Sequence, residues 1–163
     1  ELVKIASVKS SSPFGAGTSV NSLFDGSFEI GREMDSVWVE PLTPSPSVSS
    51  ISRSDTIQGW IEARLAQPMQ IVAYDLIHAE SAGFDDQFNI KAYRVLTRES
   101  QSSRWQEVLR VDHDQPVRIE RHQNENETPV EFLRLEIIEP NFQDNPKTVR
   151  LAEWAIWGIP VAE

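Results

Sequence analysis

Short runs in which apolar and polar residues alternate recur along most of the chain. In the clearest run, Leu133, Leu135 and Ile137 are separated by the charged Arg134 and Glu136, which is the period of two that a half-buried β-strand shows. The same reading predicts strands over Leu2–Val8, Gly59–Leu65, Met69–Ala79, Phe88–Thr97, Trp105–Val111, Pro116–Glu120, Val130–Ile138 and Val149–Gly158.

Polar clusters that are typical of turns separate these runs, at Arg98–Arg104, Gln123–Thr128 and Pro140–Lys147. About eight strands at this spacing predict an all-β fold, an antiparallel β-sandwich of the jelly-roll type. Helix is expected only as one turn near Val20–Phe24. Two stretches without periodicity, Pro41–Gln58 and Glu80–Gln87, are expected to be surface loops, where binding sites are common.

Length and composition narrow the picture further. The 163 residues are interpreted as one domain, 1–163, and the opening Glu1-Leu2-Val3-Lys4 leads us to expect a domain cut from a larger protein. The chain has no cysteine, which excludes disulfides, thiolate metal sites and a cysteine nucleophile. A net charge of −10 argues against nucleic acids and anionic membranes as partners, and no apolar run approaches the roughly 18 residues of a membrane span.

One carboxylate, that of Glu153, interrupts the apolar run of the last predicted strand. Strand parity places Glu153 with Leu151 and Trp157 on the face expected to be buried. A buried carboxylate needs a positive partner, and two kinds are open: an arginine or a cluster of backbone amides, or a calcium ion with oxygen ligands. Segment 21–27 offers such oxygens and favours the metal.

Six short segments occur along the chain in the same order as the matching segments of a known domain family. They are Ala6–Ser11; Leu23–Gly26 followed by Trp38; Gly59–Leu65; Ala92–Val95 with Trp105–Val108; Phe132–Leu135; and Val149–Glu153 with Trp157–Gly158. Together they resemble the discoidin, or coagulation-factor type C, domains of the galactose-binding-like β-sandwich superfamily. The resemblance covers nearly the whole chain and implies the same sandwich fold.

The resemblance also implies a structural calcium ion, which in many members links an Asp-Gly loop to the glutamate of the last strand. Carried over position by position, the ligands are the side chains of Asp25 and Glu153 and the backbone carbonyls of Ser22, Ser27 and Ala152. Such hard oxygen ligands are those that calcium prefers.

The chain departs from the family pattern just beyond the Asp-Gly pair. A Thr or Ser is usual a few residues later, whereas this chain has Phe28-Glu29-Ile30-Gly31. Glu29 or water would then supply the missing ligand, or the site would stay empty. In the alternative without metal, Asp25 caps the short turn and Glu153 pairs with an arginine.

For function, the resemblance implies a recognition module without catalysis, most often one that binds a neutral glycan and is attached to a larger secreted enzyme or surface protein. We expect the ligand site at the loop end, with Trp38, His78, Glu80 and Phe84. The histidine and arginine of galactose-binding members are missing: Val39-Glu40 follows Trp38, and His78-Ala79 stands where the arginine would be. Two alternatives stay open, a protein-interaction module of the same fold, and a structural role for Trp38 and His78.

Catalytic motifs give little support for an enzyme. Asp112-His113-Asp114 and His122 are interpreted as turn residues, and the sequence has no G-x-S-x-G, H-E-x-x-H or phosphate-loop motif. A lipid-binding role is disfavoured, since the loop Pro41–Gln58 carries Arg53 as its single basic residue. The expected location is extracellular or at the cell surface.

Overall fold

The structure is a computed structural model that describes residues 1–11, 23–24, 38–41 (backbone), 44–48, 56–144 and 147–161. Its strands are β1 (Ile5–Ser10), β2 (Trp38–Pro41), β3 (Ser45–Pro46), β4 (Thr56–Ile57), β5 (Gly59–His78), β6 (Ile90–Arg98), β7 (Gln106–Asp112), β8 (Ile119–Gln123), β9 (Val130–Pro140) and β10 (Thr148–Pro160). Two short 3-10 helices, η2 (Ala79–Ala82) and η3 (Asp86–Phe88), follow β5. Among the described residues, no helix is long and apolar enough to cross a membrane.

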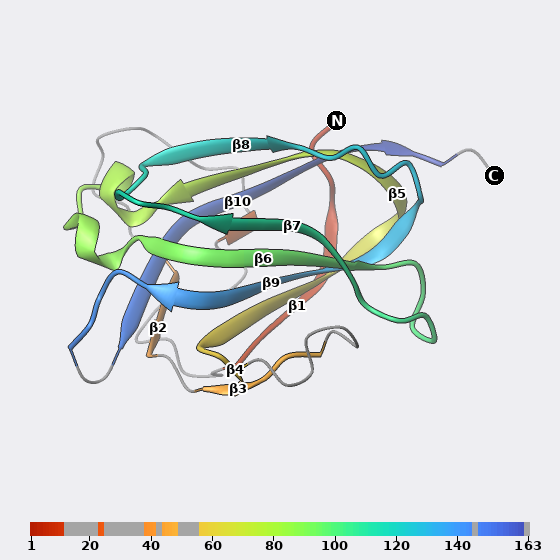
Figure 1. Cartoon of the computed structure of the whole chain (residues 1–163). Helices are drawn as coiled ribbons and strands as arrows, with labels where there is room; N and C mark the ends of the chain where they lie inside the picture. Colours follow the sequence, from red (N-terminus) through yellow and green to blue (C-terminus); the bar gives the residue numbers. More distant parts are fainter. Residues whose placement is uncertain (12–22, 25–37, 42–43, 49–55, 145–146, 162–163) are drawn as a thin grey trace.

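Strand β5 belongs to both layers of the molecule. Its first part pairs with β1 and β9, and its second part pairs with β10 and β8, all antiparallel. The pairing with β9 breaks between Arg64 and Met69, around Pro68, which has no backbone N–H to donate. One layer is therefore β1–β5–β9–β6–β7 and the other is β2–β10–β5–β8, which is the predicted antiparallel sandwich (Figure 1).

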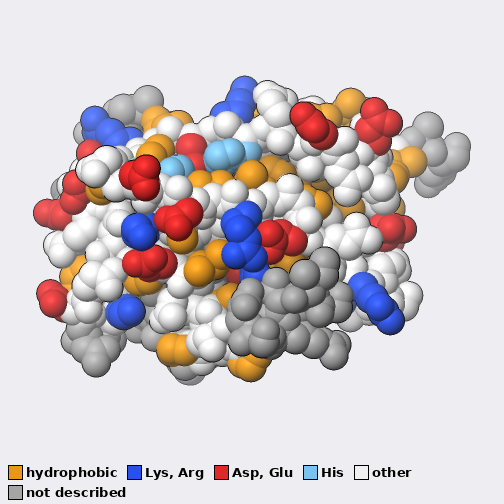
Figure 2. All heavy atoms as spheres, in the orientation of Figure 1, with side chains coloured by type: hydrophobic (Ala, Val, Ile, Leu, Met, Phe, Trp, Pro, Cys, Tyr) orange, Lys and Arg blue, Asp and Glu red, His pale blue; other side chains and the backbone are white. Residues whose placement is uncertain are grey.

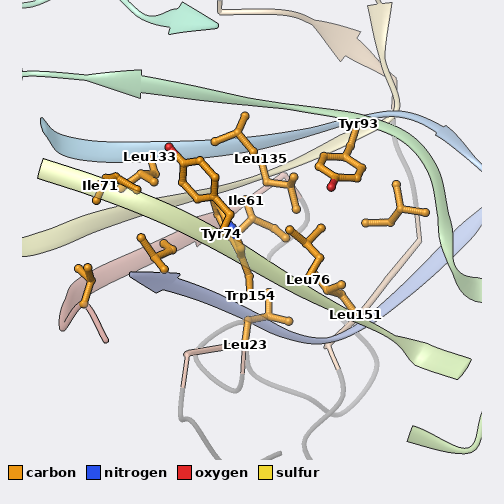
Figure 3. Close-up of a cluster of buried hydrophobic side chains, with 14 of the residues drawn as sticks. Leu23, Ile61, Ile71, Tyr74, Leu76, Tyr93, Leu133, Leu135, Leu151 and Trp154 are labelled. Carbon is orange, nitrogen blue, oxygen red and sulfur yellow. The ribbon is translucent and has the colours of Figure 1, made fainter. Parts of the chain in front are cut away.

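The core lies between these two layers. Ile61 and Leu76 from the two parts of β5, Leu135 from β9, Tyr93 from β6 and Trp154 from β10 all have at most 1 % of their surface exposed (Figure 3). Burial of this apolar surface is the main stabilising contribution to the fold. The tryptophans contribute to this packing, since Trp154 is fully buried and Trp60, Trp105 and Trp157 are half-buried.

Some elements differ from the sequence-based prediction. The two strands predicted over 59–65 and 69–79 are one continuous strand, because the chain passes from one layer to the other without a turn. The loop 41–58 contains the short pair β3–β4, and the loop 80–87 contains η2 and η3. Residues 23–24 form a 3-10 turn, within the expected single turn.

The two ends of the sandwich carry different connections. Helices η2 and η3 lie at one end, together with the β7–β8 and β9–β10 connections (Figure 1). The β6–β7 and β8–β9 turns lie at the opposite end. We call the first of these the loop end, and it contains the described part of the predicted ligand site.

Candidate functional site

The chain from 79 to 89 is held in a defined shape at the loop end. Gly83 ends η2 with a φ of 88°, a left-handed conformation that favours glycine, and its N–H bonds to the carbonyls of Ala79 and Glu80. Asp85 caps η3 by accepting a hydrogen bond from the backbone N–H of Gln87 at 3.0 Å. These local bonds make this loop a scaffold rather than a loose connection.

Asn89 joins this loop to its neighbours. The side chain is fully buried; its Oδ1 accepts from the Glu80 backbone N–H at 3.1 Å, and its Nδ2 donates to Glu80 Oε2 and to the Val117 carbonyl at 3.3 and 3.2 Å. The Asn89 carbonyl accepts from the backbone N–H of Asn141 at 3.3 Å. Through its side chain and its backbone carbonyl, Asn89 therefore ties together the β5–β6, β7–β8 and β9–β10 connections.

An array of aromatic rings and one guanidinium lies on this scaffold. The Arg150 guanidinium lies between two rings, 4.6 Å from the centroid of Phe84 and 4.4 Å from that of Phe88. Phe88 in turn stacks on Phe142, with centroids 5.4 Å apart and planes inclined by 13°. All four side chains are partly exposed. Mutual stacking fixes their orientation, so the array presents a preformed surface of aromatic faces and cationic donors.

The predicted ligand residues are only partly brought together there. Phe84 belongs to the array. The partly exposed Glu80 is on η2 of the same loop, and its Oε1 lies 3.5 Å from Arg118 Nε. The backbone of Trp38 pairs with Leu151, which also pairs with His78, but the Trp38 side chain lies outside the described part of the chain.

His78 is not available to a ligand in this structure. It is fully buried, and its Nε2 lies 2.7 Å from Glu120 Oε1 while its Nδ1 accepts from the backbone N–H of Ile90 at 3.4 Å. Both ring nitrogens are thus engaged inside the protein, which agrees with the structural alternative at this position. From the sequence alone, a histidine at the end of a strand gives no indication whether it binds a ligand or has a structural role.

Half of the predicted calcium site is described. Glu153 is 3 % exposed and Ala152 is fully buried, whereas Asp25, Ser22 and Ser27 lie outside the described residues. The expected burial of Glu153 is confirmed, but the parity argument behind it is wrong. The pairing of β10 with β5 shifts between Leu151 and Glu153, and this bulge reverses the alternation.

Because of that bulge, the side chains that point into the core are those of Val149 and Leu151 before the bulge and those of Trp154 and Ile156 after it. Ala152 instead forms a small buried cluster with Ala82 on the loop side, and Phe84 packs against this cluster. A buried carboxylate next to a bulged backbone is the kind of arrangement that fits a hard cation. The described half of the site is therefore compatible with calcium.

Sequence reasoning missed three members of the array, Phe88, Phe142 and Arg150. Phe142 could have been identified from the sequence, because a phenylalanine within the polar turn Pro140–Lys147 is expected to be exposed and is therefore a candidate for ligand contact. The alternating pattern predicts Phe88 as the first residue of a strand, whereas it ends η3 in the structure. Arg150 gave no signal, because its two aromatic partners lie more than sixty residues earlier in the chain.

Comparison with known proteins supports the fold. No protein-family model and no curated protein sequence matches the chain. Among solved structures, a family 32 carbohydrate-binding module of Streptococcus pneumoniae EndoD is similar with a TM-score of 0.73 at 16% identity, covering 98% of this chain and 100% of that one. A chitosan-binding module from Paenibacillus sp. IK-5, solved with chitotriose, has a TM-score of 0.65 at 17% identity and covers 96% and 98%.

An F5/8 type C domain from Bacteroides fragilis is similar as well, with a TM-score of 0.58 at 14% identity and coverage of 95% and 92%. These domains are of the discoidin type, so the resemblance stated from the sequence is confirmed for the fold. The chain therefore has the same antiparallel β-sandwich fold as these carbohydrate-binding modules and this F5/8 type C domain.

Proposed function

We propose that this protein is a non-catalytic carbohydrate-binding module that recognises a neutral glycan at the loop end. The observation that carries the proposal is the array of Phe84, Arg150, Phe88 and Phe142, which presents partly exposed rings around a fixed guanidinium. Aromatic faces pack against the apolar faces of sugars, and a guanidinium donates hydrogen bonds to hydroxyl groups. Binding modules among the similar structures, including one solved with chitotriose, lend support at the level of the fold.

Charge favours a neutral ligand. The chain carries a net charge of −10, and the exposed Asp85 and Asp86 lie on the same loop as Phe84. An anionic polysaccharide would meet repulsion from these carboxylates. Glu80, with its side chain 29 % exposed and held beside Arg118, would accept hydrogen bonds from sugar hydroxyls.

The proposal extends to context and to a structural ion. We place the module in a larger secreted or surface protein that acts on or adheres to carbohydrate, as the parent proteins of similar modules suggest. Calcium between Asp25 and Glu153 would stabilise the neighbouring part of the loop end. The link between the two regions is the buried pair Ala82 and Ala152, against which Phe84 packs.

A glycan array followed by calorimetry tests the function. Phe142→Ala and Phe84→Ala should each weaken binding of the best array ligand by roughly fivefold or more, since loss of an aromatic anchor costs more than about 1 kcal/mol. Trp105→Ala is the matched control, because Trp105 is also half-buried and stacked on an arginine, Arg98 at 4.6 Å, but lies at the opposite end. It should leave affinity unchanged. Binding to no glycan at millimolar concentration would reject the proposal and favour the protein-interaction alternative.

A further inference from the structure

All three histidines of the chain converge on one carboxylate, that of Glu120. Nε2 of His78 lies 2.7 Å from Glu120 Oε1, and Nε2 of His113 and of His122 lie 2.9 and 2.7 Å from Oε2. No feature of this cluster takes part in the proposed glycan site. We call these four residues the histidine cluster.

The topology explains how the histidine cluster forms. Strands β7 and β8 are the edge strands of the two layers on the same side of the sandwich (Figure 1). Glu120 and His122, two apart on β8, share one face of that strand. His78 ends β5, which pairs with β8, and His113 directly follows β7. Histidine side chains are visible at the surface in this region (Figure 2), whereas His78 is fully buried beneath it.

The hydrogen-bond pattern gives the histidines two different roles. Ile90 donates its N–H to Nδ1 of His78, so the proton of the His78 ring is on Nε2 and is donated to Glu120 Oε1. That bond orients the carboxylate. His113 and His122 have side chains 17 % and 26 % exposed, and both direct Nε2 at the other oxygen, from the solvent side.

The carboxylate is also held in its charged form. Burial raises the pKa of Glu120, but hydrogen bonds from His78, His122 and His113 together lower that pKa to about 2. The side chain of Glu120 is only 7 % exposed, so an anion is retained where it is largely removed from water. Two imidazole nitrogens, Nε2 of His113 and Nε2 of His122, lie 2.9 and 2.7 Å from the same carboxylate oxygen, Glu120 Oε2.

We propose that the histidine cluster is a binding site for a divalent transition-metal ion such as zinc, with His113 Nε2, His122 Nε2 and Glu120 Oε2 as ligands and His78 as the positioning residue for the carboxylate. Imidazole nitrogens and a carboxylate oxygen are the donors that zinc takes, at about 2.0–2.2 Å. Each ligand histidine moves its ring proton from Nε2 to Nδ1, and Nε2 then binds the metal in place of that proton. Water fills the remaining positions.

The arrangement has the expected features of a metal site. A histidine that fixes the orientation of a ligating carboxylate is a typical outer-shell partner. Both ligand histidines are on the accessible side, so an ion enters without disturbing the core. Calcium is a poor fit to two imidazoles, since it prefers oxygen ligands, so this site is chemically distinct from that of Asp25 and Glu153.

The test is metal binding by tag-free protein, measured by calorimetry with Zn²⁺ and by the visible absorption of bound Co²⁺. The wild type should bind one ion per chain, and Co²⁺ should show a ligand-field band from nitrogen ligands. His113→Gln combined with His122→Gln should weaken Zn²⁺ binding at least about tenfold and abolish the band. Glu120→Gln, which removes the carboxylate ligand, should likewise weaken Zn²⁺ binding. Glu139→Gln is its matched control, because Glu139 is a carboxylate outside the cluster that pairs with Lys91. This control should change neither the Zn²⁺ affinity nor the Co²⁺ band.

Two results would overturn the proposal. The first is equal Zn²⁺ affinity in the double variant and the wild type, which would assign the ion to acidic residues elsewhere. The second is no binding of either metal at micromolar concentration by the wild type, which would leave the cluster a hydrogen-bonded link between β5 and the β7 and β8 edges. Circular dichroism of the metal-free variants confirms that each is folded.

His78 is tested separately because it is buried. His78→Gln keeps a side-chain N–H donor, and His78→Leu does not. If His78 positions Glu120, the Leu variant should bind Zn²⁺ roughly 10–100-fold more weakly than the Gln variant, at equal circular dichroism. Equal affinities in the two folded variants would remove the positioning role.

Discussion

Arg94 Nε donates a hydrogen bond to Glu136 Oε2 at 2.8 Å, and the two side chains are directly opposite each other on β6 and β9. Both residues are fully buried, although they lie on the outer face of their layer rather than between the layers. Ser47 and Val48, from the loop 41–58, donate to the two oxygens of Glu136 at 2.8 and 3.3 Å. The loop therefore covers an ionic pair that would otherwise face solvent.

Arg94→Met should destabilise the protein by about 3–5 kcal/mol, because it leaves the Glu136 carboxylate buried with one cation fewer. Equilibrium unfolding in denaturant measures this loss. Lys91→Met is the control, since Lys91 pairs with Glu139 at the surface, and it should shift the midpoint little. Equal midpoints for Arg94→Met and the wild type would contradict the prediction.

The fold was predictable because its signals are local. The period of two in β9 and the turn clusters on either side of it specify a strand and its ends without reference to any partner. The strand β2 was missed, since a four-residue segment without alternation is defined by its pairing with β10 and not by its own sequence.

The candidate site was less predictable because its geometry depends on distant contacts. Phe84 was identified as a loop aromatic, but the role of Arg150 on β10 depends on its contacts with Phe84 and Phe88 in the β5–β6 connection. Likewise, His113 and His122 were interpreted as turn residues, while their convergence on Glu120 needs the edges of both layers. The bulge at Ala152 changed the face of Glu153, and strand parity cannot anticipate an extra residue.

Arg150→Lys tests the guanidinium of the proposed glycan site. Lysine keeps the positive charge but loses the planar fork that stacks between Phe84 and Phe88. We expect affinity for the array-selected glycan to fall roughly 10–100-fold, the range for loss of a hydrogen bond to a charged group of about 1.5–3 kcal/mol. Calorimetry measures the affinity, and a thermal melt should show little change. A fully retained affinity would place the ligand away from Arg150.

Calcium is tested through Glu153. An ion that binds only the folded state raises the melting temperature by mass action. Added Ca²⁺ should therefore raise the melting temperature, and a calcium chelator should lower it. Glu153→Gln and Asp25→Ala should each abolish the response. The measurement is best made in the His113→Gln, His122→Gln background, so that the histidine cluster does not contribute. A melting curve that does not respond to Ca²⁺ or to the chelator would argue for the arrangement without metal.

Asp75 on β5 joins three strands and should give a measurable pH dependence. Its carboxylate accepts from Arg121 on β8 at 2.5 and 2.6 Å and from Trp157 Nε1 on β10 at 2.7 Å. The hydrogen bond from Arg121 lowers the pKa of Asp75 against the opposing effect of burial, and the bond from Trp157 adds to the lowering.

A folded-state pKa below the unfolded value of 3.8 means that Asp75 stabilises the protein above that pH. This contribution is lost as the pH falls from the unfolded value through the folded one. Asp75→Asn should therefore lower the melting temperature at pH 7 and make it less sensitive to acid below about pH 4. Asp112→Asn is the matched control, because the Asp112 side chain is 70 % exposed and its loss should leave the acid profile as in the wild type. If Asp75→Asn and the wild type lose stability in parallel on acidification, the three-strand contact does not control the acid response.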